Sequence, residues 1–195
     1  MKVVAIGGSP RLNGNTNYLI DEALNELAKS GIETEKIVLN QYRVNPCQAH
    51  SNCRQSPKCL QEDDTPWILE KFSQADGVII ASPVYFGSIS AQTKTFLDRT
   101  FFLYTHNISK QAKCFGLIAI AGRAGFEQAI QELRKFIGLH DASQAKVFTL
   151  KGAIGGPDKH ARDNPQMVEE AREMGRQMAR VLLGMDRQPL ETSQR

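Results

Sequence analysis

The sequence has little of what marks membrane-spanning, disulfide-rich or nucleic-acid-binding proteins. Its 195 residues include only four cysteines and one tryptophan, and the formal net charge is +3. No apolar run approaches the roughly 18 residues that a bilayer span needs, and the basic residues are too scattered to suggest nucleic acid. The chain opens on an apolar run, without the charged start and cleavage site of an export signal. We therefore expect a cytoplasmic protein without membrane or nucleic-acid partners.

The first loop lacks the residues that two common nucleotide-binding loops require. Residues 1–6 are apolar and β-branched, which predicts a buried strand, and helical spacing begins at about Asn17. Between them runs Gly7-Gly8-Ser9-Pro10-Arg11-Leu12-Asn13-Gly14-Asn15-Thr16. This loop has no lysine before Thr16, as a P-loop would, and its glycines do not fit G-x-G-x-x-G. These absences argue against a magnesium-nucleotide site.

What the first loop does contain is a set of donors for an anion. A helix N-terminus leaves free N–H groups and a partial positive charge, and glycines let the backbone approach a phosphate closely. An ordinary tight turn between a strand and a helix rarely gathers so many polar side chains. We therefore predict a cradle for a terminal monophosphate, made by Ser9, Arg11, Asn13, Asn15 and Thr16.

The rest of the chain alternates strand and helix patterns, which predicts a doubly wound α/β sheet. Further strands are expected at residues 34–39, 77–82, 113–120 and 145–150, and helices at 17–29, 66–72, 90–103, 126–139 and 165–183. Residues 40–65 and 152–164 are expected to be loops. We expect one domain over residues 1–185 and a polar tail from Asp186 to Arg195.

Two stretches resemble signatures of a known family. Gly7 to Thr16, and Ser82-Pro-Val-Tyr-Phe-Gly-Ser-Ile-Ser-Ala-Gln92 continuing to Arg99, resemble the NADPH-dependent FMN reductase and iron–sulfur flavoprotein branch of the flavodoxin-like superfamily. The resemblance implies a five-stranded parallel sheet of order 2-1-3-4-5, with helices on both faces and the ligand at the carboxyl ends of strands 1 and 3.

The same resemblance implies a flavoprotein oxidoreductase. FMN would take a hydride from NAD(P)H and pass electrons to a small acceptor such as a quinone, a flavin, a nitro-compound or an iron complex. The cofactor carries this chemistry, so no catalytic side chain is required. Relatives are commonly homodimers or homotetramers, in which the helix after the loop of residues 83–88 packs at a subunit interface.

The flavin ring needs a flat apolar surface and nearby backbone. Tyr85 and Phe86 could instead be core aromatics at a strand end, but the family signature favours ring contacts. We expect the ring to be held by Pro83, Val84, Tyr85, Phe86 and Gly87, with Ala121 and Gly122 on its far side. His106, His140 and His160 have no partner at a recognisable spacing, and we assign them no role.

Three cysteines gather between the second strand and the second helix, while Cys114 has the setting of a buried thiol. Iron–sulfur flavoproteins carry C-x2-C-x2-C and a fourth cysteine, and by resemblance Cys47, His50, Cys53 and Cys59 would be the metal ligands. Histidine replaces the second cysteine, whereas cysteine ligation of a [4Fe–4S] cluster is the rule. Zinc, or no metal at all, is also open.

The cysteines also leave two alternative functions open. With a cluster, the protein would be an electron-transfer iron–sulfur flavoprotein that receives electrons from a ferredoxin-like donor. Without one, a redox sensor with a reversible disulfide is a further alternative.

Overall fold

A parallel sheet forms the centre of the protein in a computed structural model that describes residues 1–138, 144–156 and 159–185. Its strands are β1 (Lys2–Gly7), β2 (Glu33–Val38), β3 (Gly77–Tyr85), β5 (Cys114–Ala121) and β6 (Lys146–Ala153), with the short β4 (Ser88–Ile89) antiparallel to β3. The order is β2-β1-β3-β5-β6. Counted along the parallel strands this is 2-1-3-4-5, so the predicted flavodoxin-like sheet is confirmed, with β4 as an addition.

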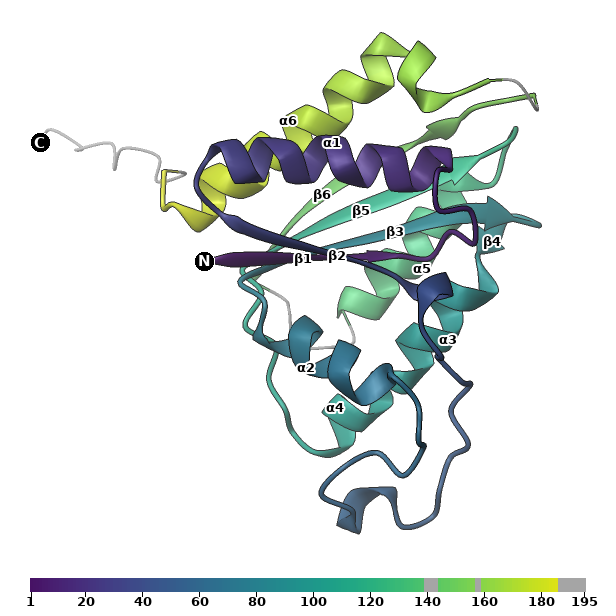
Figure 1. The fold of residues 1–195 in the computed structure, drawn as a ribbon, viewed down its shortest axis with the longest axis vertical. Coiled ribbons are helices and arrows are strands. Elements are labelled where there is room, and N and C mark those ends of the chain that lie inside the picture. Colours follow the sequence, from purple (N-terminus) through teal and green to yellow (C-terminus); the bar gives the residue numbers. More distant parts are fainter. Residues whose placement is uncertain (139–143, 157–158, 186–195) are drawn as a thin grey trace, which may run out of the picture.

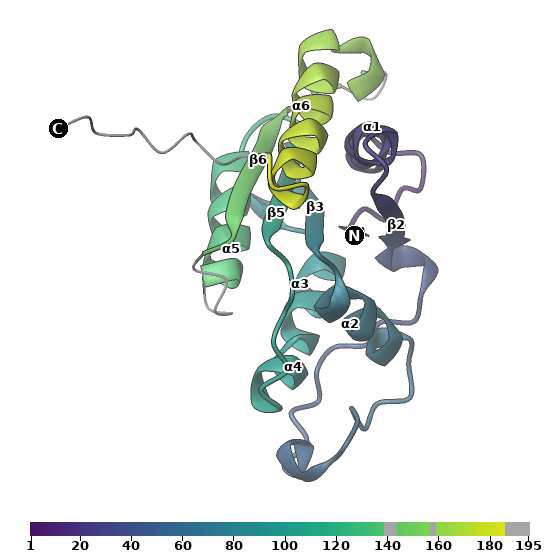
Figure 2. The same cartoon turned by 90° about the vertical axis from the view of Figure 1, so that its left-hand side faces the viewer.

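Helices cover both faces of this sheet (Figure 1). The α-helices are α1 (Asn15–Lys29), α2 (Thr65–Gln74), α3 (Ala91–Arg99), α4 (Phe101–Thr105), α5 (Phe126–Gly138) and α6 (Pro165–Leu182), and the 3-10 turns are η1 (Leu39–Gln41), η2 (Cys53–Gln55) and η3 (Ala161–Asp163). Helices α1 and α6 pack together on one face, and α2, α3 and α5 lie on the other (Figure 2). No helix among the described residues is both long and apolar enough to cross a bilayer.

The pleat of β1 explains why both faces need helices. Val3 and Ala5 belong to the apolar cluster under α1 and α6, whereas Val4 and Ile6 belong to the cluster under α2, α3 and α5. All four side chains are fully buried. Successive side chains of a strand point to opposite faces, so an unbroken apolar strand must be covered on both sides.

Two strands extend three residues further than predicted, and one predicted helix is divided. β3 continues past Ser82 to Tyr85 because it folds back on β4, and β6 reaches Ala153, inside the predicted loop. The predicted helix over residues 90–103 is divided at Thr100. There the Thr100 hydroxyl donates to the Leu97 carbonyl oxygen at 2.7 Å, and Leu103 N–H bonds back only three residues, which breaks the α-helical ladder. Leu139, His140 and the predicted tail lie outside the described residues.

Candidate functional site

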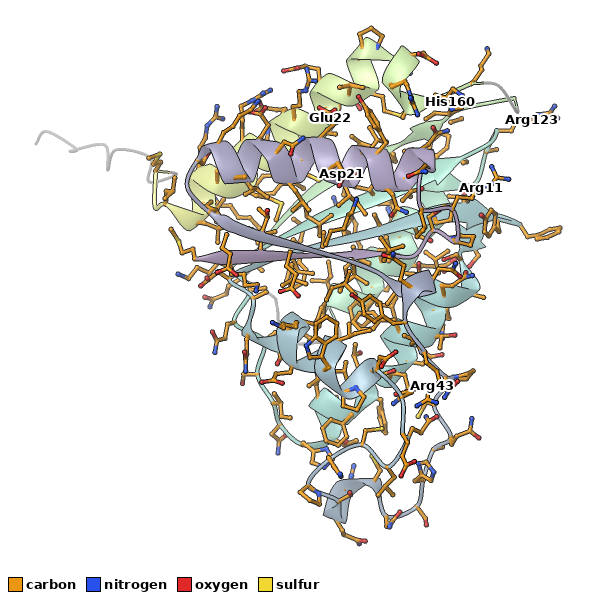
Figure 3. All side chains as sticks on the ribbon, viewed as in Figure 1. Arg11, Asp21, Glu22, Arg43, Arg123 and His160 are labelled. Atoms are coloured by element: carbon orange, nitrogen blue, oxygen red, sulfur yellow. The ribbon has the colours of Figure 1, made fainter. Side chains whose placement is uncertain are left out.

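A cavity of about 680 Å³ opens where β1, β3 and β5 end. This volume is in the usual range for cofactor pockets. Its described lining contains no acidic side chain and consists of Ser9, Arg11, Asn13, Gly14, Asn15, Thr16, Pro83, Val84, Tyr85, Ile120, Ala121, Gly122, Ile154, Gly156, Lys159 and His160. The three predicted binding segments therefore meet around one space, at the end of the sheet where Figure 3 shows Arg11, Arg123 and His160.

The first loop is folded by its own polar side chains. Ser9 Oγ accepts from Arg11 N–H at 3.2 Å, and Asn17 Nδ2 donates to the carbonyl oxygens of Arg11 and Leu12 at 2.9 and 3.2 Å. Asn17 is almost completely buried. No sequence motif indicated a role for Asn17, yet its side-chain amide binds these two carbonyl oxygens, so they are engaged within the loop and do not face an anion.

The N-terminus of α1 lies at this cavity without a side-chain cap. The cap residue is Gly14, the first turn has no acidic residue, and the first N–H that bonds within the helix is that of Tyr18, to Gly14 O. By contrast, Ser90 and Asn164 cap α3 and α6 through their side chains. The free N–H groups of α1, beside the Arg11 guanidinium, make this end of the cavity fit a phosphate group.

A cluster of buried hydroxyl groups joins the first loop to the second. Ser90 Oγ donates to Gly8 O at 2.7 Å and lies 2.8 Å from Thr93 Oγ1, while Ser82 Oγ accepts from Ser90 N–H at 2.9 Å. These three hydroxyl side chains are fully buried. These bonds hold the loop after β1 against the end of β3 and the start of α3, next to the residues that line the cavity.

The second loop is a tight hairpin. Tyr85 pairs with Ser88, and the two residues between them have positive φ angles, 52° at Phe86 and 79° at Gly87. Positive φ at both central positions is the pattern of a type I′ turn, which suits two-residue hairpins. Pro83, Val84 and Tyr85 line the cavity, but Phe86 and Gly87 do not. Phe86 is instead fully exposed at the tip of the turn.

The far wall comes from the last residue of β5 and the loop after it. Ala121 and Gly122 line the cavity, and a Cβ added at Gly122 would meet no atom within 4 Å. At Gly125 an added Cβ would lie 2.6 Å from Gly87 Cα, so these two loops touch. Ala121, Pro83 and Val84 give this part of the cavity apolar side chains, which suit a flavin ring.

Part of the cavity wall was missed by the sequence analysis. Ile120, Ile154, Gly156, Lys159 and His160 line it, and all but Ile120 follow β6. Ile154 N–H donates to Ala121 O at 2.8 Å, which continues the pairing of β5 and β6 into this segment. The topology offered a signal, because β6 is parallel to β5 and its carboxyl end must also reach this edge.

The cysteine loop, residues 45–63, does not line the cavity, and it projects away from the edge where β1, β3 and β5 end (Figure 1). Cys47 is exposed, Cys53 and Cys59 are partly buried, and Cys114 is buried in β5 as predicted. Among the described residues, no three His, Cys, Asp or Glu side chains come close enough together to hold a metal. The predicted ligands Cys47, His50, Cys53 and Cys59 are therefore not brought together, and as arranged they do not fit a cluster.

A buried ion pair closes this loop. Arg99, at the end of α3, and Asp63 have side chains that are 1% and 0% exposed. Arg99 Nη2 donates to Asp63 Oδ1 at 3.1 Å and to Cys59 Sγ at 3.2 Å, while Nη1 donates to Asn45 O at 2.8 Å. One guanidinium thus holds both ends of the loop and one of its thiols.

The charges of this pair are mutually dependent. Burial alone would raise the pKa of Asp63, but hydrogen bonds from Arg99 and from the backbone N–H groups of Asn45 and Thr65 outweigh it and lower that pKa. Burial likewise opposes the charge of Arg99, yet its bonds to Asp63 and Cys59 raise its pKa. Both side chains are therefore ionised at neutral pH.

Known proteins are similar in sequence to this chain over most of its length. A protein called iron–sulfur flavoprotein from Methanocaldococcus jannaschii is 37% identical over 190 residues, which cover 93% of this chain and 97% of that protein. Another of that name from Archaeoglobus fulgidus is 34% identical over 163 residues, covering 81% of this chain and 74% of its own.

The fold also recurs among solved structures. The NAD(P)H:quinone oxidoreductase from Methanothermobacter marburgensis superposes with a TM-score of 0.70 at 19% identity, covering 91% of this chain and 96% of that one. At this identity the likeness concerns the fold alone. Residues 1–154, which hold the cavity's three predicted segments, match a described protein family. This chain belongs to the NADPH-dependent FMN reductase family.

Proposed function

We propose that this protein is an FMN-dependent oxidoreductase that accepts a hydride from NAD(P)H and passes electrons to a small acceptor. The proposal rests on one observation: an uncapped helix N-terminus with Arg11 lies at a cavity that apolar residues of β3 and β5, among them Pro83, Val84 and Ala121, also line. Membership of the NADPH-dependent FMN reductase family supports it. FMN, when bound, supplies the hydride acceptance and the electron release.

The residues of the chain have binding and orienting roles in this proposal. Arg11 and the first N–H groups of α1 neutralise and hold the phosphate. Pro83, Val84 and Ala121 exclude water from the ring and fix its plane. Tyr85, which is 43% exposed, borders the open side where a second substrate would enter. No side chain need move a proton.

Reconstitution tests this function directly. Purified protein is titrated with FMN while flavin fluorescence is followed, and NADPH or NADH is then added without oxygen. We expect saturable FMN binding, loss of the visible flavin absorption after the nucleotide is added, and its return with a quinone or a ferric complex. Failure to bind FMN would refute the proposal, and binding without reduction by either nucleotide would refute the NAD(P)H donor.

A second candidate function follows from the names of the relatives. Two similar chains are called iron–sulfur flavoproteins, and this chain retains three of the thiols with His50. An electron-transfer role with a ferredoxin-like donor would require the loop of residues 45–63 to rearrange around a [4Fe–4S] cluster. Iron and zinc analysis of protein purified without oxygen tests this alternative, which stoichiometric iron and sulfide would favour.

The expected homodimer or homotetramer has a candidate surface. Phe101 and Tyr104 on α4 are 50% and 60% exposed, and their rings lie 6.0 Å apart. We propose that copies of the chain pair through this helix, which is the second part of the helix predicted after the loop of residues 83–88. Light scattering of the wild type and of Tyr104→Glu tests the proposal, since a charge in the interface should favour the monomer.

A further inference from the structure

Asn15 forms hydrogen bonds that hold residues 159–161 beside the predicted phosphate cradle. Its Oδ1 accepts from Ala161 N–H at 2.9 Å, and its Nδ2 donates to Lys159 O at 3.4 Å. Asn15 begins α1, whereas the other two residues lie almost 150 positions later. Ala161 is fully buried, so the attachment point is fixed. The side chain that we expected to bind phosphate is thus already engaged.

This attachment brings additional positive charge to the cavity. Lys159 and His160 line it together with Arg11, and Figure 3 shows His160 and Arg11 at the same end of the sheet. Within the described parts of the chain, neither Lys159 nor Arg11 forms an ion pair, and no acidic side chain lines the cavity. Two full charges therefore join the partial charge of the α1 N-terminus.

We propose that Lys159 binds the FMN phosphate together with Arg11 and the α1 N–H groups, and that Asn15 is the residue that positions Lys159. The inference rests on the proposed function. Arg11 and the α1 N–H groups approach the phosphate from the first loop, and Lys159 approaches from the segment that Asn15 holds beside them. A phosphate dianion has three terminal oxygens, and an ammonium group serves it as a compact point charge. His160 contributes a further ring N–H donor.

Comparing FMN with riboflavin isolates the phosphate contribution, because riboflavin has the same ring without the phosphate. We expect Lys159→Met to weaken FMN binding about 10-fold, as the loss of a charge-assisted hydrogen bond does, and to leave riboflavin binding unchanged. Unchanged riboflavin binding also shows that the variant is folded. The matched control is Lys113→Met, an exposed lysine just before β5 at the opposite end of the sheet.

The positioning role predicts non-additivity. Asn15→Ala should lower the preference for FMN over riboflavin about as much as Lys159→Met does. The double variant should prefer FMN no less than the single variant with the lower preference. His160→Gln should have a smaller effect of the same kind. Additive losses in the double variant would show that Asn15 acts on the phosphate independently, which would overturn its positioning role.

The alternative ligand for Lys159 is a phosphate group on a nucleotide substrate, which has the same charge and hydrogen-bonding groups as the FMN phosphate. Calorimetry with 2′,5′-ADP on FMN-saturated protein separates the two. If Lys159→Met weakens 2′,5′-ADP binding but keeps the preference for FMN over riboflavin, Lys159 serves the substrate and the proposal is overturned. If the wild-type protein does not bind FMN more tightly than riboflavin, the proposed function itself is refuted. If the wild type prefers FMN and Lys159→Met keeps that preference, only this inference is refuted.

Discussion

Ser90 Oγ donates a 2.7 Å hydrogen bond to the carbonyl oxygen of Gly8, and both groups are buried. Space around this bond is so limited that a Cβ on Gly8 would lie 1.8 Å from Thr93 Oγ1. The backbone of the first loop therefore touches side chains at the start of α3, at a position where only glycine fits.

Replacing Gly8 by alanine should force these two segments apart. We expect Gly8→Ala to lower the free energy of unfolding by about 1–3 kcal/mol, as overpacking does, and to weaken FMN binding. Urea unfolding measures the first effect. Thr93→Ala removes the hydroxyl that the new methyl group would hit, so Gly8→Ala/Thr93→Ala should lose less stability than the two single changes together. Strict additivity would contradict the contact.

Removing the cation of the first loop should weaken FMN binding with little effect on folding. Arg11 is exposed and lines the cavity, so we expect Arg11→Met to cost about 1.5–3 kcal/mol of FMN binding and to leave the melting temperature unchanged. Thr16→Ala should act in the same direction, by about 1 kcal/mol. Arg123→Met is the control, since Arg123 does not line the cavity. An FMN dissociation constant unchanged in Arg11→Met would remove Arg11 from the site.

Filling the cavity should abolish FMN binding in an otherwise stable protein. A side chain at Gly122 would meet open space, so Gly122→Leu should alter the free energy of unfolding by no more than about 0.5 kcal/mol while blocking the ring site. Gly138→Leu, equally unobstructed but at the end of α5, is the matched control for the fluorescence titration. Full FMN affinity in Gly122→Leu would place the ring elsewhere.

The buried ion pair predicts a dependence of stability on pH. The pKa of Asp63 is lowered in the folded protein, so its carboxylate stabilises the fold fully at pH values above its pKa in the unfolded chain, about 3.9. This stabilisation is lost as the pH falls through the pKa of Asp63 in the folded protein. Wild-type stability should therefore drop as the pH falls below about 4, and Asp63→Asn should flatten this part of the profile.

The same pair predicts a large mutational effect at neutral pH. Arg99→Met leaves the Asp63 carboxylate buried without its partner and should cost about 3–5 kcal/mol. Asp98→Asn is the control on the same helix, because the Lys94–Asp98 pair is 60% and 50% exposed and should contribute about 1 kcal/mol at most. Equal effects of Arg99→Met and Asp98→Asn on chemical denaturation would contradict the buried pair.

The cysteines should differ sharply in reactivity. Burial raises the pKa of Cys114 to about 12, so at about pH 8 it is a protonated and inaccessible thiol. Cys47 is exposed and should be alkylated first, whereas Cys114 should react only after unfolding. Timed iodoacetamide labelling with peptide mass spectrometry checks this order. Labelling of Cys114 in the native protein at the rate of Cys47 would refute it.

The fold could be predicted because its signals are local. Val78 to Ala81 form an unbroken apolar run, and such a run is typical of a strand covered on both faces. The topology rule then gathers the ends of β1, β3 and β5, and of the residues expected to hold FMN, all but Phe86 and Gly87 line the cavity. Their contact with FMN stays a prediction.

What could not be predicted depends on contacts between distant parts of the chain. Lys159 and His160 reach the cavity because Asn15 binds their segment, and no local pattern records that pairing. Arg99 has the sequence setting of an ordinary helix residue, and its burial follows from Asp63, 36 positions earlier. The cysteine spacing indicated which donors were present but not whether they would converge, since convergence depends on how the whole loop folds.

The turn after Tyr85 has a practical consequence. Phe86 stands clear of the rest of the described chain, one residue beyond the cavity wall, and the protein's single tryptophan, Trp67, is in α2 on a different part of the molecule. An indole placed at this tip would therefore be a fluorescent reporter beside the entrance, sensitive to whatever arrives there from solution.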